Sequence, residues 1–363
     1  MNCLNVMEIL LPTPIHKKNT SLKNKLTRRI LTWLRLTDQP AIKIYRGFGN
    51  DEQLTIHGTV FLRSPQPRKK YRSNVWVNFL GLIRLFLVKP YPQAIVTVLA
   101  NDQTIETKAD ADGYFRVSIT LARPLFPGWY PVKAQLIAET LMDKPILAEG
   151  EGSVLIPHKT KFACISDIDD TFLVSHSATI TKRLMVLLTR NAHTRQPFEG
   201  VVAHYKLLAE ASSGPGVTNP FFYVSSSEWN LYDYILEFSA KNGLPEGVYF
   251  LSPLKQLREV LKTGQNKHMT KFMRIVRILE AYPQQRFVLL GDDTQEDPTI
   301  YASIVEHFPH QISCVYIRQV YQKNQPKTQD KLDSIDAMGV PYCYFAHSAE
   351  ARQHSIDNGF VAT

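Results

Sequence analysis

Cysteine is scarce in this sequence. The four cysteines are Cys3, Cys164, Cys314 and Cys343, and no two of them have Cys-x-x-Cys spacing. That absence argues against a zinc site. Cys164 and Cys314 stand inside apolar runs, so we expect them to be small core residues in a reducing compartment, the cytoplasm.

Long hydrophobic runs are also missing. The longest, residues 75–88 ("VWVNFLGLIRLFLV"), is interrupted by Arg84 and is shorter than the roughly 20 residues that span a bilayer. The N-terminal "MNCLNVMEILLPTP" has no basic head before its short apolar run, so we expect no secretory signal. No motif combines aromatic and basic residues as nucleic-acid-binding proteins do, and we expect no nucleic-acid partner.

What the chain does contain is positive charge. Its 363 residues are enough for one large domain or two ordinary ones, and its net charge of +9 favours anionic partners. Residues 16–36 carry seven Lys/Arg and no acid, and one apolar stripe recurs there at helical spacing: Leu22, Leu26, Ile30, Trp33 and Leu34. We therefore expect residues 1–39 to form a basic amphipathic segment. It either lies on an anionic membrane surface, as a peripheral contact, or packs on the protein's own body.

Residues 40–158 have the pattern of an all-β domain. Short apolar runs are bounded by Gly, Pro, Asn and Asp, and "DADGYF" (residues 110–115) contains the Asp-Gly pair of a tight turn. Regular strand spacing with turn signals predicts a β-sandwich-like domain. A basic and then apolar insertion, residues 63–90, either covers this domain or touches lipid.

Residues 159–363 have a different pattern, in which apolar runs alternate with helical ones. The expected strands include "KFACISD", "PFFYVSS", "VYFL", "RFVLLGDD" and "ISCVYIR". They are apolar throughout, as in a parallel sheet covered on both faces. We therefore expect an α/β, doubly wound domain with its functional residues at the carboxyl ends of the strands.

The polar clusters follow these strands. Asp167 and Asp169 come after the first strand, Ser225 to Ser227 after "FFYV", and Asp292 after "FVLLG", while Lys271 opens the helix before that last strand. Singly, such residues are usually turns, helix caps or solvated side chains. Together in one crevice, several carboxylates require a cation, and Mg²⁺ with a phosphate is the usual combination.

The order D-x-D-x-T, serine, helix lysine and G-D-x-x-x-x-D resembles the haloacid dehalogenase (HAD) superfamily of phosphotransferases and phosphatases. "YRGFG", "DADGYF", "PGWYPV", "DIDDT", "TRQPFEGV", "NPFFYVSSSEWNLYDYILEF" and "FVLLGDDTQEDPTIY" are similar to the fungal actin-patch-protein phosphatidate phosphatases and their bacterial relatives. The likeness runs from about residue 40 to the C-terminus.

The resemblance implies a role for each matching residue. Asp167 is the nucleophile, which forms an aspartyl-phosphate, and Asp169 is the general acid and base. Ser225, Ser226 and Lys271 bind the phosphate, and Thr171 orients the loop beside them. Mg²⁺ is bound by Asp167, the carbonyl of Asp169 and Asp292, with Asp297 as ligand or supporting residue. The expected reaction is hydrolysis of a phosphomonoester, phosphatidate to diacylglycerol.

Several assignments stay open at this point. Lys267 shares a helix face with Lys271 and is the alternative phosphate lysine. Asp293 stands where relatives usually have Ser and either replaces or assists Asp297, while Glu228 stands where they usually have Pro. The superfamily places a substrate-screening cap at residues 172–219, here with the cations Lys182, Arg183, Arg190 and Arg195.

Two other functions compete with a lipid phosphatase. One is hydrolysis of a soluble or protein phosphomonoester. The other is a scaffold without turnover, whose basic surfaces bind a membrane; the intact set of acids, serine and lysine argues against it. The sequence does not indicate an oligomeric state.

Overall fold

The computed structural model describes residues 36–37, 39–65, 87–138, 145–168, 200–211, 214, 216–253 and 267–361. The predicted basic helix, residues 16–36, lies outside this part of the chain except for Leu36, which begins a strand. Most of the 63–90 insertion and residues 172–199 of the predicted cap also lie outside it. No helix among the described residues is long and apolar enough to cross a membrane.

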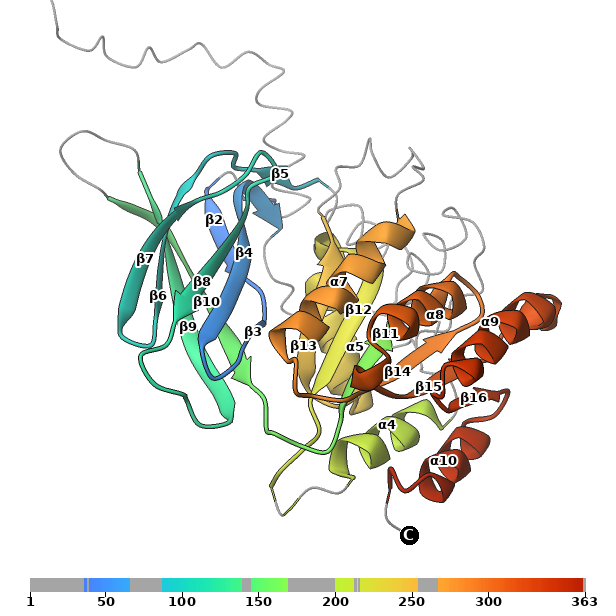
Figure 1. Ribbon diagram of the computed structural model, residues 1–363. Helices are drawn as coiled ribbons and strands as arrows, with labels where there is room; N and C mark the ends of the chain where they lie inside the picture. The colour runs from blue at the N-terminus through green and yellow to red at the C-terminus, as the bar shows by residue number, and fades with distance from the viewer. Residues whose placement is uncertain are drawn as a thin grey trace, which may run out of the picture.

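The N-terminal half forms one ten-stranded sheet (Figure 1). Its strands are β1 (Leu36–Thr37), β2 (Ala41–Ile44), β3 (Gly47–Gly49), β4 (Gln53–Pro65), β5 (Lys89–Pro90), β6 (Ile95–Ala100), β7 (Gln103–Lys108), β8 (Tyr114–Thr120), β9 (Gly128–Ile137) and β10 (Ile146–Ile156). The main path runs β1-β4-β3-β10-β9-β6-β7, with β2, β5 and β8 also paired to β4. The prediction of a strand-rich first half is confirmed, and its arrangement as a sandwich stays a prediction.

Alternation of apolar and polar residues decides which side of these strands is buried. In β8, every second residue is buried and those between are exposed or half-buried. Ile56 of β4 and Val96 of β6 are completely buried in the same apolar cluster. Full burial of such a side chain contributes about 1.5–3 kcal/mol, so this one-sided core holds the sheet together.

The C-terminal half forms a six-stranded parallel sheet in the order β13-β12-β11-β14-β15-β16. Its strands are β11 (Ala163–Asp167), β12 (Phe221–Glu228), β13 (Gly247–Ser252), β14 (Phe287–Asp292), β15 (Ile312–Arg318) and β16 (Tyr342–Phe345). Its helices are α4 (Val201–Glu210), η1 (Trp229–Leu231), α5 (Tyr232–Asn242), α7 (Lys267–Ala281), α8 (Asp297–His307), η2 (Pro309–Gln311), η3 (Gln322–Asn324), α9 (Gln325–Ala337) and α10 (Ser348–Asp357).

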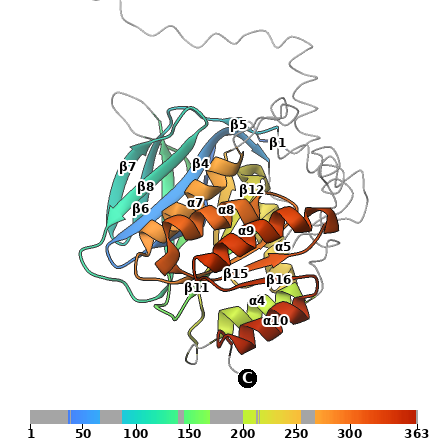
Figure 2. The ribbon, with the colours of Figure 1, turned by 45° about the vertical axis from the view of Figure 1, so that its right-hand side comes forward.

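Helices cover both faces of this sheet. Cys164, buried as expected, belongs with α4, α5 and α10 to one apolar cluster, whereas its neighbour Ile165 belongs with α7, α8 and α9 to another. Figure 2 shows α4 beside α10 on one side and α7, α8 and α9 on the other. Helix α4 lies within residues 172–219, so this part of the predicted cap region packs on the sheet.

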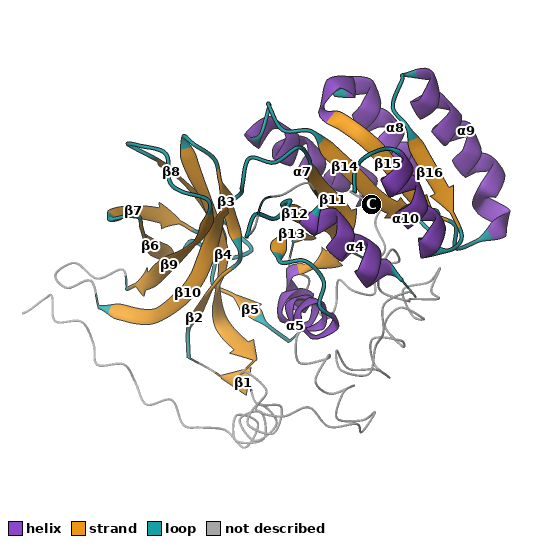
Figure 3. Cartoon of the chain, turned by 90° about the horizontal axis from the view of Figure 1, so that it is seen from below, coloured by secondary structure: helices purple, strands orange, loops and turns teal. Residues whose placement is uncertain are grey.

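A short segment of the first sheet docks on the second, and Figure 3 shows the two sheets next to each other. The segment is residues 45–50. The Arg46 backbone N–H donates to the Tyr232 hydroxyl (3.0 Å), and the Tyr282 hydroxyl donates to the Gly49 carbonyl (2.9 Å). Gly47 has no room for a side chain, because a Cβ there would lie 2.4 Å from the Thr55 carbonyl oxygen. Close approach of the backbone thus explains the glycine in "YRGFG".

Candidate active site

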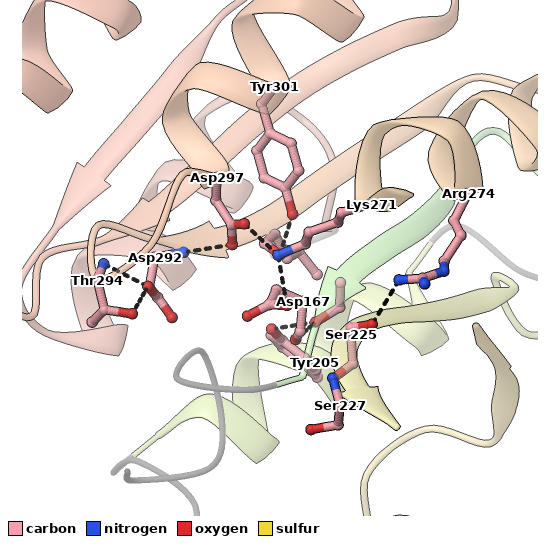
Figure 4. A network of polar contacts seen from close by, with 12 residues as sticks. Asp167, Tyr205, Ser225, Ser227, Lys271, Arg274, Asp292, Thr294, Asp297 and Tyr301 are labelled. Carbon is pink, nitrogen blue, oxygen red and sulfur yellow. Dashed lines mark hydrogen bonds and ion pairs between the residues drawn. The ribbon is translucent and has the colours of Figure 1, made fainter. Parts of the chain in front are cut away.

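The polar side chains gather where the strand order of the parallel sheet reverses. From β11 the chain moves outward to β12 and β13, and then returns to the other side of β11 as β14. Neighbouring loops diverge at such a point and leave a crevice beyond the carboxyl ends of the strands. Asp167 ends β11 and Asp292 ends β14, so both carboxylates stand at this point (Figure 4).

Lys271 connects two of the carboxylates. Its Nζ donates to Asp167 Oδ1 (2.7 Å) and also forms an ion pair with Asp297. All three side chains are at most 3% exposed. The lysine comes from the first turns of α7 and Asp297 from the start of α8, so three separate elements meet at one ammonium group.

Asp292 completes a group of three carboxylates. One carboxylate oxygen from each of Asp167, Asp292 and Asp297 lies within 4.8 Å of the others. Asp292 is held by Thr294, whose backbone N–H (2.7 Å) and hydroxyl (2.6 Å) both donate to Oδ1. Gly291 keeps the strand close to α8, because a Cβ there would lie 2.7 Å from Asp297 Oδ2.

Burial and charge act against each other in this cluster. Burial disfavours the ammonium form of Lys271, but the carboxylates of Asp167 and Asp297 outweigh that effect and raise its pKa. Burial raises the pKa of Asp297 to about 6, although the charge of Lys271 opposes the shift. Three buried carboxylates share a single ammonium group, so the cluster is short of positive charge.

A divalent cation would balance the excess of negative charge in this cluster. The oxygens of Asp167, Asp292 and Asp297 are hard, anionic donors of the kind that Mg²⁺ prefers, and they are close enough together to share one ion. Within the described residues, no histidine or cysteine joins the group. These three carboxylates could therefore hold one hard divalent cation.

The serine run lies on a bulge beside Asp167. The pairing of β12 with β13 shifts between Val224 and Glu228, so residues 225–227 leave the regular ladder. Such a bulge re-aims side chains at the end of a strand. The Ser225 hydroxyl accepts the Ser227 N–H (2.8 Å), and the Ser225 carbonyl accepts a hydrogen bond from Arg274 Nη1 (2.9 Å).

Four further residues support the site and were missed by the sequence argument. The Ser166 hydroxyl donates to the Asp167 carbonyl (2.8 Å) and is bonded to the Tyr205 hydroxyl (2.8 Å). The Tyr301 hydroxyl donates to the Leu290 carbonyl (2.9 Å). The fourth is Arg274, whose position three residues after Lys271 on one helix face was the available signal.

The structure separates Asp293 from the carboxylate group. Its Oδ1 accepts the backbone N–H groups of Val320 (2.8 Å) and Tyr321 (3.1 Å), and its Oδ2 accepts the Tyr344 hydroxyl (2.9 Å). Asp293 thus holds the segment after β15, while Asp297 faces Lys271. Glu228 ends β12, half-buried.

Other predicted residues fall outside the described part of the chain. They are Asp169, Thr171, Lys182, Arg183, Arg190, Arg195 and the side chain of Lys267. Ser226 is buried next to Ser225 on the bulge. Of the candidate residues that are described, Asp167, Lys271, Asp292 and Asp297 form the central group.

Comparison with known proteins finds relatives by sequence. Residues 162–319, which carry the whole cluster, match the sequence model of a family described as "Phosphatidate phosphatase APP1, catalytic domain". The chain is 25% identical over 248 residues to Phosphatidate phosphatase APP1 of Saccharomyces cerevisiae, covering 65% of this chain and 40% of that protein. It is 23% identical over 239 residues to the uncharacterized protein C29B5.04c of Schizosaccharomyces pombe, covering 62% and 38%.

The chain thus spans about two fifths of the length of these curated relatives. Among solved structures, a carbohydrate acetylesterase from Xanthomonas citri matches with a TM-score of 0.30 and 9% identity, covering 82% of this chain and 66% of that one. A likeness this weak carries no argument. Sequence similarity is the informative comparison, and by it residues 162–319 are similar to the catalytic domains of APP1-type phosphatidate phosphatases.

Proposed function

We propose that this protein is a Mg²⁺-dependent phosphatase that hydrolyses a phosphomonoester, with phosphatidate as the substrate and diacylglycerol and inorganic phosphate as products. One observation carries the proposal. A buried carboxylate, Asp167, is paired with Lys271 and stands beside Asp292 and Asp297, within the residues that match the phosphatidate phosphatase family. Carboxylate, lysine and clustered acids are the parts that phosphoryl transfer through an aspartate requires.

A HAD-like, doubly wound fold is part of this proposal. It is supported by the parallel sheet with helices on both faces and by the reversal of strand order between β11 and β14. The expected nucleophile, Asp167, is the last residue of the central strand β11. The sheet therefore provides a rigid base for Asp167.

The first step is attack of an Asp167 carboxylate oxygen on phosphorus. A bond forms between that oxygen and phosphorus, the bond from phosphorus to the alcohol oxygen breaks, and the alcohol oxygen leaves with the electron pair. Attack by one anion on another is opposed by charge repulsion. Lys271 offsets that repulsion, since it already lies 2.7 Å from Asp167 and keeps its proton.

The second step is hydrolysis of the aspartyl-phosphate, which releases inorganic phosphate and regenerates Asp167. Dividing the reaction in this way replaces one difficult displacement with two easier ones. Asp169 donates a proton to the leaving oxygen and then accepts one from water, a task worth about 10²–10⁴-fold in rate. This role rests on the D-x-D spacing of the sequence.

Ser225 and its neighbour Ser226 would hold the phosphoryl oxygens. Ser225 is fixed by its hydrogen bond from Ser227 and by Arg274, so its position costs little reorganisation when substrate binds. Asp167, Asp292 and Asp297 would hold Mg²⁺. When bound, Mg²⁺ neutralises charge on the transferring phosphoryl group.

A panel of substrates tests the proposal. Phosphate release is measured with phosphatidate in mixed micelles, with a short-chain phosphatidate, and with soluble sugar and aryl phosphates, each with Mg²⁺ or with chelator. We expect Mg²⁺-dependent release that is greatest with the lipids. Turnover of soluble phosphomonoesters alone would overturn the lipid assignment, and no release from any of them would overturn the phosphatase assignment.

Asp167→Asn and Asp333→Asn form the matched pair of variants for this panel. Both exchange a carboxylate for an amide of the same shape, but Asp333 is exposed on α9, away from the cluster. Activity should be lost in the first variant and kept in the second.

A further inference from the structure

A cavity of about 200 Å³ lies between the two sheets, away from the carboxylate cluster. His57 of β4 and Tyr114 and Arg116 of β8 line it from the first sheet. Trp229 of η1 and two residues of α7, Arg274 and Arg277, line it from the other side. None of Asp167, Asp292 and Asp297 lines the cavity.

Guanidinium groups from both halves of the protein face this cavity. Arg116 and Arg277 are exposed side chains, and in the part of the chain that the structure describes neither forms an ion pair with a carboxylate. Arg274 is buried and donates to the Ser225 carbonyl (2.9 Å) and to the Ser252 hydroxyl (3.2 Å). Arg116 and Arg277, which form no ion pair among the described residues, therefore bring two positive charges to the cavity.

The other polar groups of the cavity do not cancel this charge. Asp110 and Asp112 also line it and contribute two negative charges, and the Asp110 Oδ1 is held in place by the N–H groups of Asp112 (2.8 Å) and Tyr114 (2.9 Å). Burial, helped by the charge of Arg116, lowers the pKa of His57 to about 3, so this ring is neutral at physiological pH. Three guanidinium groups against two carboxylates make the lining net positive.

The wall behind the guanidinium groups is rigid and aromatic. Trp229 stacks on Tyr45 with the ring centroids 3.9 Å apart, and His57 lies 5.3 Å from Trp229. Phe250 lines the same wall and packs against Phe48, with centroids 5.4 Å apart. A preformed wall of this kind holds its shape without a ligand, which lowers the cost of binding one.

We propose that this cavity binds a phosphate-type anion between Arg116 and Arg277. Guanidinium groups match the oxygens of phosphate with parallel hydrogen bonds, and two of them from opposite walls can clamp one group. The anion comes either from free phosphate or from the headgroup of an acidic lipid. The site is separate from the carboxylate cluster, so it does not depend on the proposed reaction.

Titration of the full-length protein with inorganic phosphate tests the site. Calorimetry in excess chelator favours this site over the active site, where three carboxylates repel an anion. Arg116→Ala and Arg277→Ala should each weaken phosphate binding about tenfold, equivalent to about 1.4 kcal/mol, and the double variant more. The matched controls are Arg123→Ala and Arg352→Ala, exposed arginines that do not line the cavity.

Binding that is unchanged in the double variant overturns the proposal. Equal weakening in Arg123→Ala and Arg352→Ala overturns it as well, because the effect would then come from overall charge. A circular dichroism spectrum and a melting temperature like those of the unaltered protein show that a loss of binding is not due to misfolding. If the double alanine variant is unfolded, it is replaced by the double variant Arg116→Gln with Arg277→Gln, which keeps the start of the aliphatic chain and a polar end but removes the charge.

A second arm distinguishes the two sources of the anion. Sedimentation with phosphatidylcholine vesicles is compared with and without phosphatidylglycerol, a lipid whose phosphodiester the proposed reaction does not cleave. If the double variant loses both phosphate binding and the preference for phosphatidylglycerol, the cavity takes a lipid headgroup. If it loses phosphate binding alone, the ligand is free phosphate. Both results support the anion site.

Discussion

Replacing Gly291 with alanine probes the carboxylate cluster without removing any of its charges. A Cβ at this position would lie 2.7 Å from Asp297 Oδ2, 2.8 Å from Tyr301 Cε2 and 3.0 Å from Asp297 Cβ. Both neighbours are completely buried, and both are held by hydrogen bonds. The new methyl group therefore displaces Asp297 from Lys271 and from the end of β14.

The size of the effect follows from these contacts. Forcing additional methyl or methylene groups into a packed interior costs about 1–3 kcal/mol of unfolding free energy. For a unit of about 200 residues, this corresponds to a fall in melting temperature of about 2–12 °C. Activity should fall more steeply, by about 10²-fold in kcat/KM, since a displacement of about 1 Å at catalytic groups has that effect.

Phosphate release and thermal unfolding of the same preparation measure the two effects. Gly214→Ala is the matched control, because a Cβ at Gly214 would meet no atom within 4 Å. We expect Gly214→Ala to keep both activity and melting temperature. Wild-type kcat/KM in Gly291→Ala would refute the reasoning, since it would mean that Asp297 can leave its place without consequence.

Three further predictions use the same assays. Asp167→Asn should lower kcat by several orders of magnitude with little loss of stability, and near-normal turnover would rule out Asp167 as the nucleophile. Excess chelator should abolish phosphate release and Mg²⁺ should restore it, whereas full activity in chelator would contradict the magnesium assignment. Because burial lowers the folded-state pKa of His57 to about 3, only the unfolded chain takes up this proton as the pH falls below about 6.5. Unfolding free energy should then decrease between pH 6.5 and 3, by up to about 1.4 kcal/mol per pH unit, and His57→Gln should flatten the profile; an equally steep decrease in His57→Gln would contradict the assignment.

Hydrophobic pattern predicted most of the strands and helices that surround the site. "YFRVSIT" lies in β8, where apolar and polar residues alternate, and "FVLLG" lies in β14, where every residue is buried. Both patterns are recognisable in a sequence as strands. Four strands of the first sheet were missed, and two of them, β1 and β5, are only two residues long. β3 is only "GFG", which has the composition of a turn, and β7 ("QTIETK") has no fully buried residue. Helix α9 was also missed, since its buried residues are few: Thr328, Leu332 and Ile335.

The site was predictable where it depends on strand ends and unpredictable where it depends on distant partners. Asp167 and Asp292 follow apolar runs, so the sequence placed them at one edge of the sheet. The position of Arg274 on the same helix face as Lys271 indicates only that it is near the site. Its hydrogen bond to Ser225 joins positions 49 residues apart, and no local sequence pattern predicts such a contact. The same is true of Asp293. Its partner Tyr344 belongs to β16, which was not predicted because it is four residues long and mostly half-buried.

The first sheet takes part in holding the active site, although it supplies none of the acids. Trp229 begins η1 directly after β12, one residue beyond the serine bulge, and stacks on Tyr45, which belongs to the docked segment 45–50. Phe48 of β3 is counted among the core residues of the parallel sheet, against Phe250. Arg274 fixes the bulge from α7 while Tyr45 and Trp229 fix its end from the first sheet. Residues 162–319 therefore contain the carboxylates and the lysine of the proposed site, but not all of the packing that positions them.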